Sequence, residues 1–284
     1  MGSSSVAVPI MAWLPVALIL VIIGAALRRG WARRSPTTGG VERFAKAWHL
    51  RLTAEAAAVI SGYMTGTRRW RRGGAAAGVA AGAGAGVAWS SGILSVLLAG
   101  LVGGVVGYFV GSVLAEASAR LGPAEGGPRT AELHVRTRHE YLDPRMFAVV
   151  VLAPIVGTAL FVSRIGGDGF DWPTPLALLL VAGCIVAALE LGIRRVVRRP
   201  RPSGDADMVA VCDAIAASAA QVLVSSGGCV VFWSLAWEAL ATTDGGEPTV
   251  AIHTWVGIFD FVIAVAFWAQ RNRIERPATA EPVA

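Results

Sequence analysis

Charged residues are scarce in this chain. Asp, Glu, Lys and Arg make up 15% of its 284 residues, whereas 55% are hydrophobic and the mean hydropathy is +0.59. An average soluble protein carries about a quarter charged residues, so this composition excludes an ordinary water-soluble fold. Lysine is nearly absent, with Lys46 as its only representative, so nearly all of the basic charge behind the net +6 is arginine.

Paired-cysteine motifs and nucleotide-binding motifs are also lacking. Cys184, Cys212 and Cys229 show no CxxC spacing, so they predict neither a disulfide framework nor a zinc site, and we expect buried, inert thiols. The sequence has no GxxxxGK[ST] phosphate-binding loop and no complete dinucleotide fingerprint. An ATPase or a Rossmann enzyme is therefore not expected.

A catalytic constellation is missing too. His134, His139 and Glu140 do not form an HExxH motif, because Pro144 ends any helix there and the two histidines do not share a helical face. No Ser/His/Asp arrangement is evident either. We therefore predict no catalytic residues, no metal site and no cofactor.

Arginine, in contrast, is concentrated in clusters that border long apolar runs. A stretch of about twenty apolar residues spans the hydrocarbon core of a bilayer, and clustered arginine marks the cytoplasmic side of short loops. The basic residues therefore indicate anionic lipid headgroups as partners rather than nucleic acid. The arginines predicted to contact these headgroups are Arg68, Arg69, Arg71, Arg72, Arg194, Arg195, Arg198 and Arg199.

These patterns predict an all-α, multi-pass protein of the cell inner (plasma) membrane, with about seven transmembrane helices, the N-terminus outside and the C-terminus in the cytoplasm. The predicted segments are a first transmembrane helix (residues 1–34), a cytoplasmic amphipathic interfacial helix with a basic cluster (35–72), a glycine-rich transmembrane hairpin (73–115), a cytoplasmic loop (116–145), a second transmembrane hairpin (146–196), a basic linker with an amphipathic segment (197–216), a third transmembrane hairpin (217–270) and a disordered cytoplasmic tail (271–284).

Apolar residues recur every three or four positions across residues 41–60, with charged residues between them. This pattern predicts an amphipathic helix. It fits a helix lying in the membrane interface with its apolar face down, and it fits about equally a helix packed on a cytosolic part of the same chain.

Glycines repeat at intervals of four in both arms of the charge-free segment 73–115. Residues four apart share one face of a helix, so each arm presents a face without side chains on which another helix can pack closely. The arms can pack on each other within one chain, or the faces can join copies of the chain. The glycines concerned are Gly78, Gly82, Gly86, Gly103, Gly107 and Gly111.

Asp260 lies in the middle of the last apolar run. A carboxylate at the centre of a bilayer costs several kcal/mol unless it is paired, protonated or in contact with water, so it is a candidate for proton or ion movement. The structural alternative is a neutral, hydrogen-bonded carboxyl that joins two helices. Glu190, in contrast, lies four residues before Arg194, and this spacing predicts an ion pair at the membrane interface.

These features predict a non-enzymatic function. The first expectation is a membrane subunit or accessory component of a transport or export assembly, either as a homo-oligomer or with another membrane protein. The alternative is an autonomous channel or a proton-coupled carrier that uses Asp260.

Overall fold

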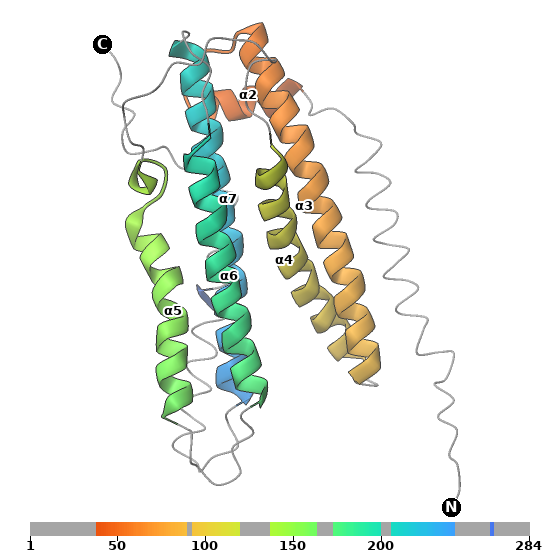
Figure 1. The fold of residues 1–284 in the computed structure, drawn as a ribbon. Coiled ribbons are helices and arrows are strands. Elements are labelled where there is room, and N and C mark those ends of the chain that lie inside the picture. Colours follow the sequence, from red (N-terminus) through yellow and green to blue (C-terminus); the bar gives the residue numbers. More distant parts are fainter. Residues whose placement is uncertain are drawn as a thin grey trace, which may run out of the picture.

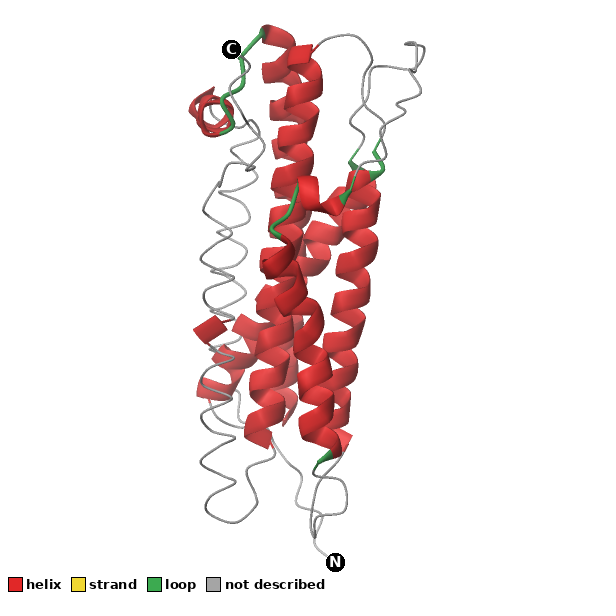
Figure 2. Cartoon of the chain, turned by 90° about the vertical axis from the view of Figure 1, so that its left-hand side faces the viewer, coloured by secondary structure: helices red, strands yellow, loops and turns green. Residues whose placement is uncertain are grey.

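The computed structural model describes residues 38–89, 93–119, 137–163, 173–199, 206–241 and 262–263. The predicted features outside these ranges include the first span, the tail at 271–284, Asp260, His134 and, except for residues 262–263, the last span. Over the described residues the fold is all-α (Figures 1 and 2). Its helices are α2 (Thr38–Ala47), α3 (Ala54–Trp89), α4 (Ile93–Ser118), α5 (Pro144–Val162), α6 (Pro173–Val197) and α7 (Ala206–Ala241), with a 3-10 turn η2 at Arg138–Glu140.

Three of these helices are long and apolar enough to cross a membrane. They are Ala99–Ser118 within α4, Pro173–Val197, which is all of α6, and Ala206–Ala236 within α7, while Pro144–Ala159 of α5 is apolar but shorter. Spans of this length and composition indicate a membrane protein. The seven spans, their orientation and the inner membrane as location stay predictions.

Helix α7 lies at the centre of the described bundle. It packs against α3, α4, α5 and α6, while α3 and α4 form an antiparallel pair (Figure 1). Its side chains Val211, Ile215 and Leu223 are completely inaccessible. The outer helices, in contrast, expose large apolar residues such as Ile155 of α5 and Leu191 of α6. A bundle with an apolar interior and an apolar outer surface suits hydrocarbon on its outside.

The helix predicted over residues 41–60 is interrupted. Helix α2 ends at Ala47, His49 adopts a left-handed conformation with φ 51°, and the Thr53 side chain then accepts a hydrogen bond from Ala56 N at the start of α3. The apolar face of α2, including Phe44 and Trp48, is buried in the main core. The apolar face of α2 therefore packs on the same chain, and a position of α2 at the membrane interface stays a prediction.

Two other predicted boundaries fall inside continuous helices. Helix α3 runs unbroken through the arginines at 68–72, so this basic cluster lies on a helix surface rather than in a loop. Helix α7 begins at Ala206, so the amphipathic segment that ends at residue 216 continues directly into the predicted span. Clusters of charged residues mark where the chain meets water, but a helix can continue past this position without ending.

The cysteines follow the prediction in part. Cys212 and Cys229 are buried, as expected, but Cys184 is exposed on α6. Its thiol lies on a face of α6 that the sequence pattern alone cannot assign, because α6 is apolar on nearly every side.

Candidate functional site

A buried ionic cluster joins the middle of α3, the last turn of α4 and the segment that directly follows α6. Glu116, in the last turn of α4, is 1% exposed, and its two carboxylate oxygens lie 2.9 Å from Nη2 of Arg71 and 2.9 Å from Nη2 of Arg199. The Tyr63 hydroxyl donates a further hydrogen bond of 2.9 Å to the same carboxylate. We call these four residues the Glu116 clamp.

The local structure explains how the clamp forms. Tyr63 and Arg71 are eight residues apart on α3, slightly more than two helical turns, so their side chains reach the same neighbour. Arg199 follows the last turn of α6 and also donates to the backbone carbonyl of Glu116. Arg195 donates to the carbonyl of Ala117 at 2.8 Å. The two arginines thereby satisfy carbonyls that the C-terminus of α4 leaves without a helical partner.

The charges and hydrogen bonds of the clamp stabilise the contact between these helices. Both oxygens of Glu116 accept hydrogen bonds from guanidinium groups. Burial and the adjacent carboxylate raise the pKa of Tyr63 above its ordinary value, so its hydroxyl stays protonated and remains a donor. Both oxygens of this carboxylate are occupied. Glu116 therefore connects helices and does not offer a free carboxyl group to a substrate.

The sequence analysis missed this cluster. The sequence signal that could have identified Glu116 is its position as the first charged residue after the charge-free segment 73–115. Its partners are 45 and 83 residues away along the chain, at Arg71 and Arg199. No spacing rule identifies such partners.

The predicted glycine faces lie against each other within one chain. A Cβ added at Gly78 would overlap the Gly103 carbonyl and lie 2.9 Å from the Cα of Gly107. A Cβ added at Gly82 would lie 3.2 Å from the Cα of Gly103, and one at Gly111 would lie 3.0 Å from the Cα of Arg71. Gly86 is buried as well. Because α3 and α4 approach backbone to backbone here, most of these glycines are already used within the α3–α4 pair.

A second small-residue face remains open. Gly62 and Gly66, four residues apart on α3, have no atom of the described residues within 4 Å of an added Cβ. They line a groove of about 360 Å³ between α3 and α4, together with Ala58, Val59, Tyr63, Thr67, Trp70, Ala115, Ser118 and Ala119. The spacing is the same as in the segment 73–115, and the sequence analysis overlooked it because these glycines lie among polar residues.

The arginines predicted to contact lipid fall into two groups. Arg71 and Arg199 belong to the clamp, Arg195 binds the end of α4, and Arg194 pairs with Glu190 at 2.8 Å, as the spacing of four predicted. Arg194 and Arg195 are nevertheless exposed, as are Arg68, Arg69, Arg72 and Arg198. Contact between these exposed arginines and lipid headgroups stays a prediction.

Positive charge is crowded near the middle of α3. The pKa of Arg68 is lowered, first by partial burial and then by repulsion from Arg72, Arg43 and Arg71. A group whose neighbours disfavour its charge gains most from a nearby anion. The crowding therefore supports an anionic partner at this surface.

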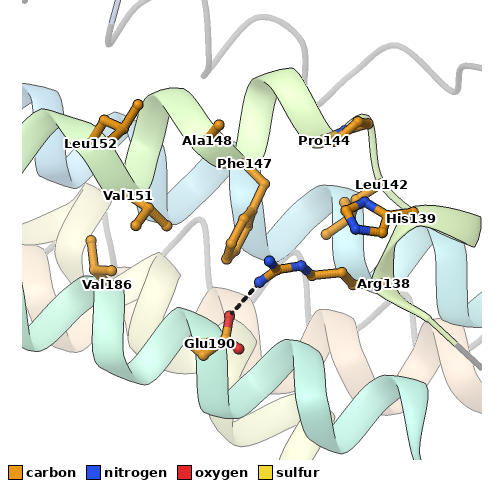
Figure 3. Close-up of a pocket in the computed structure, with 10 residues that line it drawn as sticks. All are labelled: Arg138, His139, Leu142, Pro144, Phe147, Ala148, Val151, Leu152, Val186 and Glu190. Atoms are coloured by element: carbon orange, nitrogen blue, oxygen red, sulfur yellow. Dashed lines mark ion pairs between the residues drawn. The ribbon is translucent and has the colours of Figure 1, made fainter.

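Metal binding finds no support within the described ranges. No group of three His, Cys, Asp or Glu side chains there could hold an ion. His139 is exposed at η2 and lines the same cavity as Arg138 and Glu190 (Figure 3).

Comparison with known proteins adds no further information on this site. The sequence matches no protein-family model, and it matches neither a curated protein nor a solved structure.

Proposed function

We propose that this protein is a non-enzymatic membrane subunit, an accessory component of a membrane assembly such as a transport or export complex. The observation that carries the proposal is the open groove at Gly62 and Gly66. Glycine faces that pack within the chain cannot recruit a partner, whereas this face has the room to do so.

The groove suits a helix of a partner protein. Small residues let two helix backbones approach closely, and in or near lipid this contact replaces the hydrophobic driving force. Gly62 and Gly66 provide such a surface on α3, and Ala115 and Ser118 provide small side chains on the opposite wall from α4. A bulky side chain at the floor of the groove would keep a partner helix at a distance.

The Glu116 clamp supports this role, because it fixes the two walls of the groove. Tyr63 lines the groove and at the same time donates to Glu116. The middle of α3 and the end of α4 are thereby held together before any partner arrives. A preformed site loses less conformational entropy on binding than one that must be ordered.

Co-purification tests the proposal. Tagged wild-type protein is isolated from native membranes, and its partners are identified by mass spectrometry. Gly66→Leu fills the groove and is expected to reduce a stoichiometric partner at least about tenfold, the effect of a loss of about 1.4 kcal/mol in binding free energy.

Gly84→Leu is the matched control. Gly84 lies on α3 with open space around it, but outside the groove. Both substitutions raise helix propensity, so a difference between them reports the groove itself. Equal recovery of the partner with both variants, or a wild-type protein that retains no stoichiometric partner, would contradict the proposal.

The alternative is an autonomous channel or proton-coupled carrier. It depends on Asp260, whose position in the middle of an apolar run is its support. Asp260→Asn should abolish flux in reconstituted vesicles while leaving the elution profile of the protein unchanged. Undiminished flux would exclude Asp260 from the transport path.

A further inference from the structure

A second cavity lies between α5 and α6, beside the turn η2 (Figure 3). It has a volume of about 530 Å³, which is within the range of about 300–1,000 Å³ that small-molecule sites occupy. One end is polar, formed by Arg138, His139 and Glu190. The rest of the wall is apolar, formed by Leu142, Pro144, Phe147, Ala148, Val151, Leu152 and Val186.

Two guanidinium groups lie beside one carboxylate at the polar end: Arg138 lines the cavity, and Arg194, which does not line it, adjoins it through Glu190. Nη1 of Arg138 lies 3.6 Å from one oxygen of Glu190, and Nε of Arg194 lies 2.8 Å from the other. The Arg138 guanidinium also lies over the Phe147 ring, 4.8 Å from its centroid. One carboxylate thus faces two guanidinium groups, and the side chains of Arg138 and Arg194 are 46% and 61% exposed. An anion can reach both from outside.

The apolar wall continues onto the outer surface of the bundle. Leu152 lines the cavity and is nevertheless 54% exposed, and its neighbours on α5, Ile155 and Val156, are 61% and 59% exposed. The cavity is therefore continuous with a surface suited to hydrocarbon. Its occupant must have an apolar part that enters from this side and an anionic part that ends at Arg138.

We propose that this cavity binds one anionic phospholipid of the surrounding bilayer. An acyl chain lies along Val151, Leu152 and Val186, and the phosphate lies beside Arg138 and Arg194. Basic pockets between transmembrane helices bind anionic headgroups in this manner. The proposal is independent of the partner groove, because the two sites share no lining residue.

The experiment measures lipid binding by native mass spectrometry. Delipidated protein in detergent is titrated with phosphatidylglycerol and, separately, with phosphatidylcholine of the same acyl chains. The wild type should bind one phosphatidylglycerol about tenfold more tightly than phosphatidylcholine, since charge-assisted contacts to the phosphate are not opposed by a headgroup cation.

Two variants separate the two ends of the site. Arg138→Gln removes a guanidinium from the polar end, and Ala148→Phe fills the apolar part. Each should weaken binding of phosphatidylglycerol about fivefold or more. The matched controls are Arg145→Gln and Val149→Phe, exposed positions near the start of α5 that do not line the cavity, and these should bind as the wild type does.

Other results would overturn the proposal. Equal affinity for the two lipids would show that the polar end does not select an anion. Unchanged binding with Ala148→Phe would place the lipid outside the cavity. Failure of the folded, delipidated wild type to bind either lipid would show that the cavity is not open to lipid, for example because another segment of the chain covers it.

Discussion

Replacing Glu116 by glutamine tests whether the clamp holds α3, α4 and the segment after α6 together. The substitution keeps the shape of the side chain but removes the negative charge between Arg71 and Arg199. The side chains of these arginines are only 14% and 11% exposed, so water cannot fully replace the lost carboxylate. Breaking a buried ion pair by removing one partner costs about 3–5 kcal/mol, because a charge is left buried and unpaired.

Thermal unfolding in detergent micelles, followed by tryptophan fluorescence, measures this cost. A loss of 3–5 kcal/mol corresponds to a fall in Tm of roughly 6–20 °C, if each kcal/mol shifts Tm by about 2–4 °C. Replacing Glu116, Arg71 and Arg199 together by Leu, Met and Met should recover most of the loss, because a buried ionic cluster can be exchanged for apolar side chains at little cost.

Glu190→Gln is the matched control. Glu190 also faces two arginines, Arg138 and Arg194, but their side chains are 46% and 61% exposed. Pairs of this kind contribute about 0–1 kcal/mol. If Glu116→Gln and Glu190→Gln lowered Tm equally, or if Glu116→Gln had no effect, the reasoning from burial would be refuted.

Three further predictions follow from the packing of the helices. Gly78→Leu should separate α3 from α4 and lower Tm far more than Gly84→Leu, because an added Cβ at Gly78 meets the backbone of α4 whereas one at Gly84 meets open space; equal shifts would contradict the close approach. The raised pKa of Tyr63 favours the neutral phenol in the folded state. Its contribution to the free energy of unfolding should therefore be fully present below pH 10.0 and be lost as the pH rises above it. Tyr63→Phe should reduce this alkaline loss in unfolding measurements at pH 9 and pH 11, and an unchanged loss would exclude Tyr63 as its source. Cys184, exposed in the middle of an apolar helix, should react in vesicles with an apolar maleimide but not with a charged one, whereas rapid labelling by the charged reagent would place it in water.

Local interactions were accessible from the sequence. The ion pair of Glu190 and Arg194 spans four residues of one helix, and the helix geometry alone brings these two side chains together. The glycine repeats likewise predicted helix faces that allow close approach. Whether such a face packs on the same chain or on another could not be decided in this way, because the answer depends on which helix lies opposite.

The helix boundaries were harder to predict from the sequence. Arginine clusters indicate where a helix meets water, and the cluster at residues 68–72 was interpreted as a boundary, whereas the boundary at residue 216 was placed at the end of an amphipathic segment. Helix α3 continues through the first region, because arginine is itself a good helix former, and α7 continues through the second, where neither glycine nor proline interrupts the chain. The turn at His49, in contrast, breaks a periodic pattern that looked continuous, since histidine is among the few residues other than glycine that adopt a left-handed conformation with some frequency.

Composition and charge distribution alone determined that this is an all-α protein with helices suited to a membrane, because the solvent around a helix dictates which residues it can expose. Only the tertiary structure decided how the polar groups are used. It joined Glu116 to Arg71 and Arg199 across 45 and 83 residues of chain, closed one glycine face and left the other open. The physical reason is that a buried charge takes its partner from whichever helix end packs beside it, and that neighbour is set by the arrangement of the whole bundle.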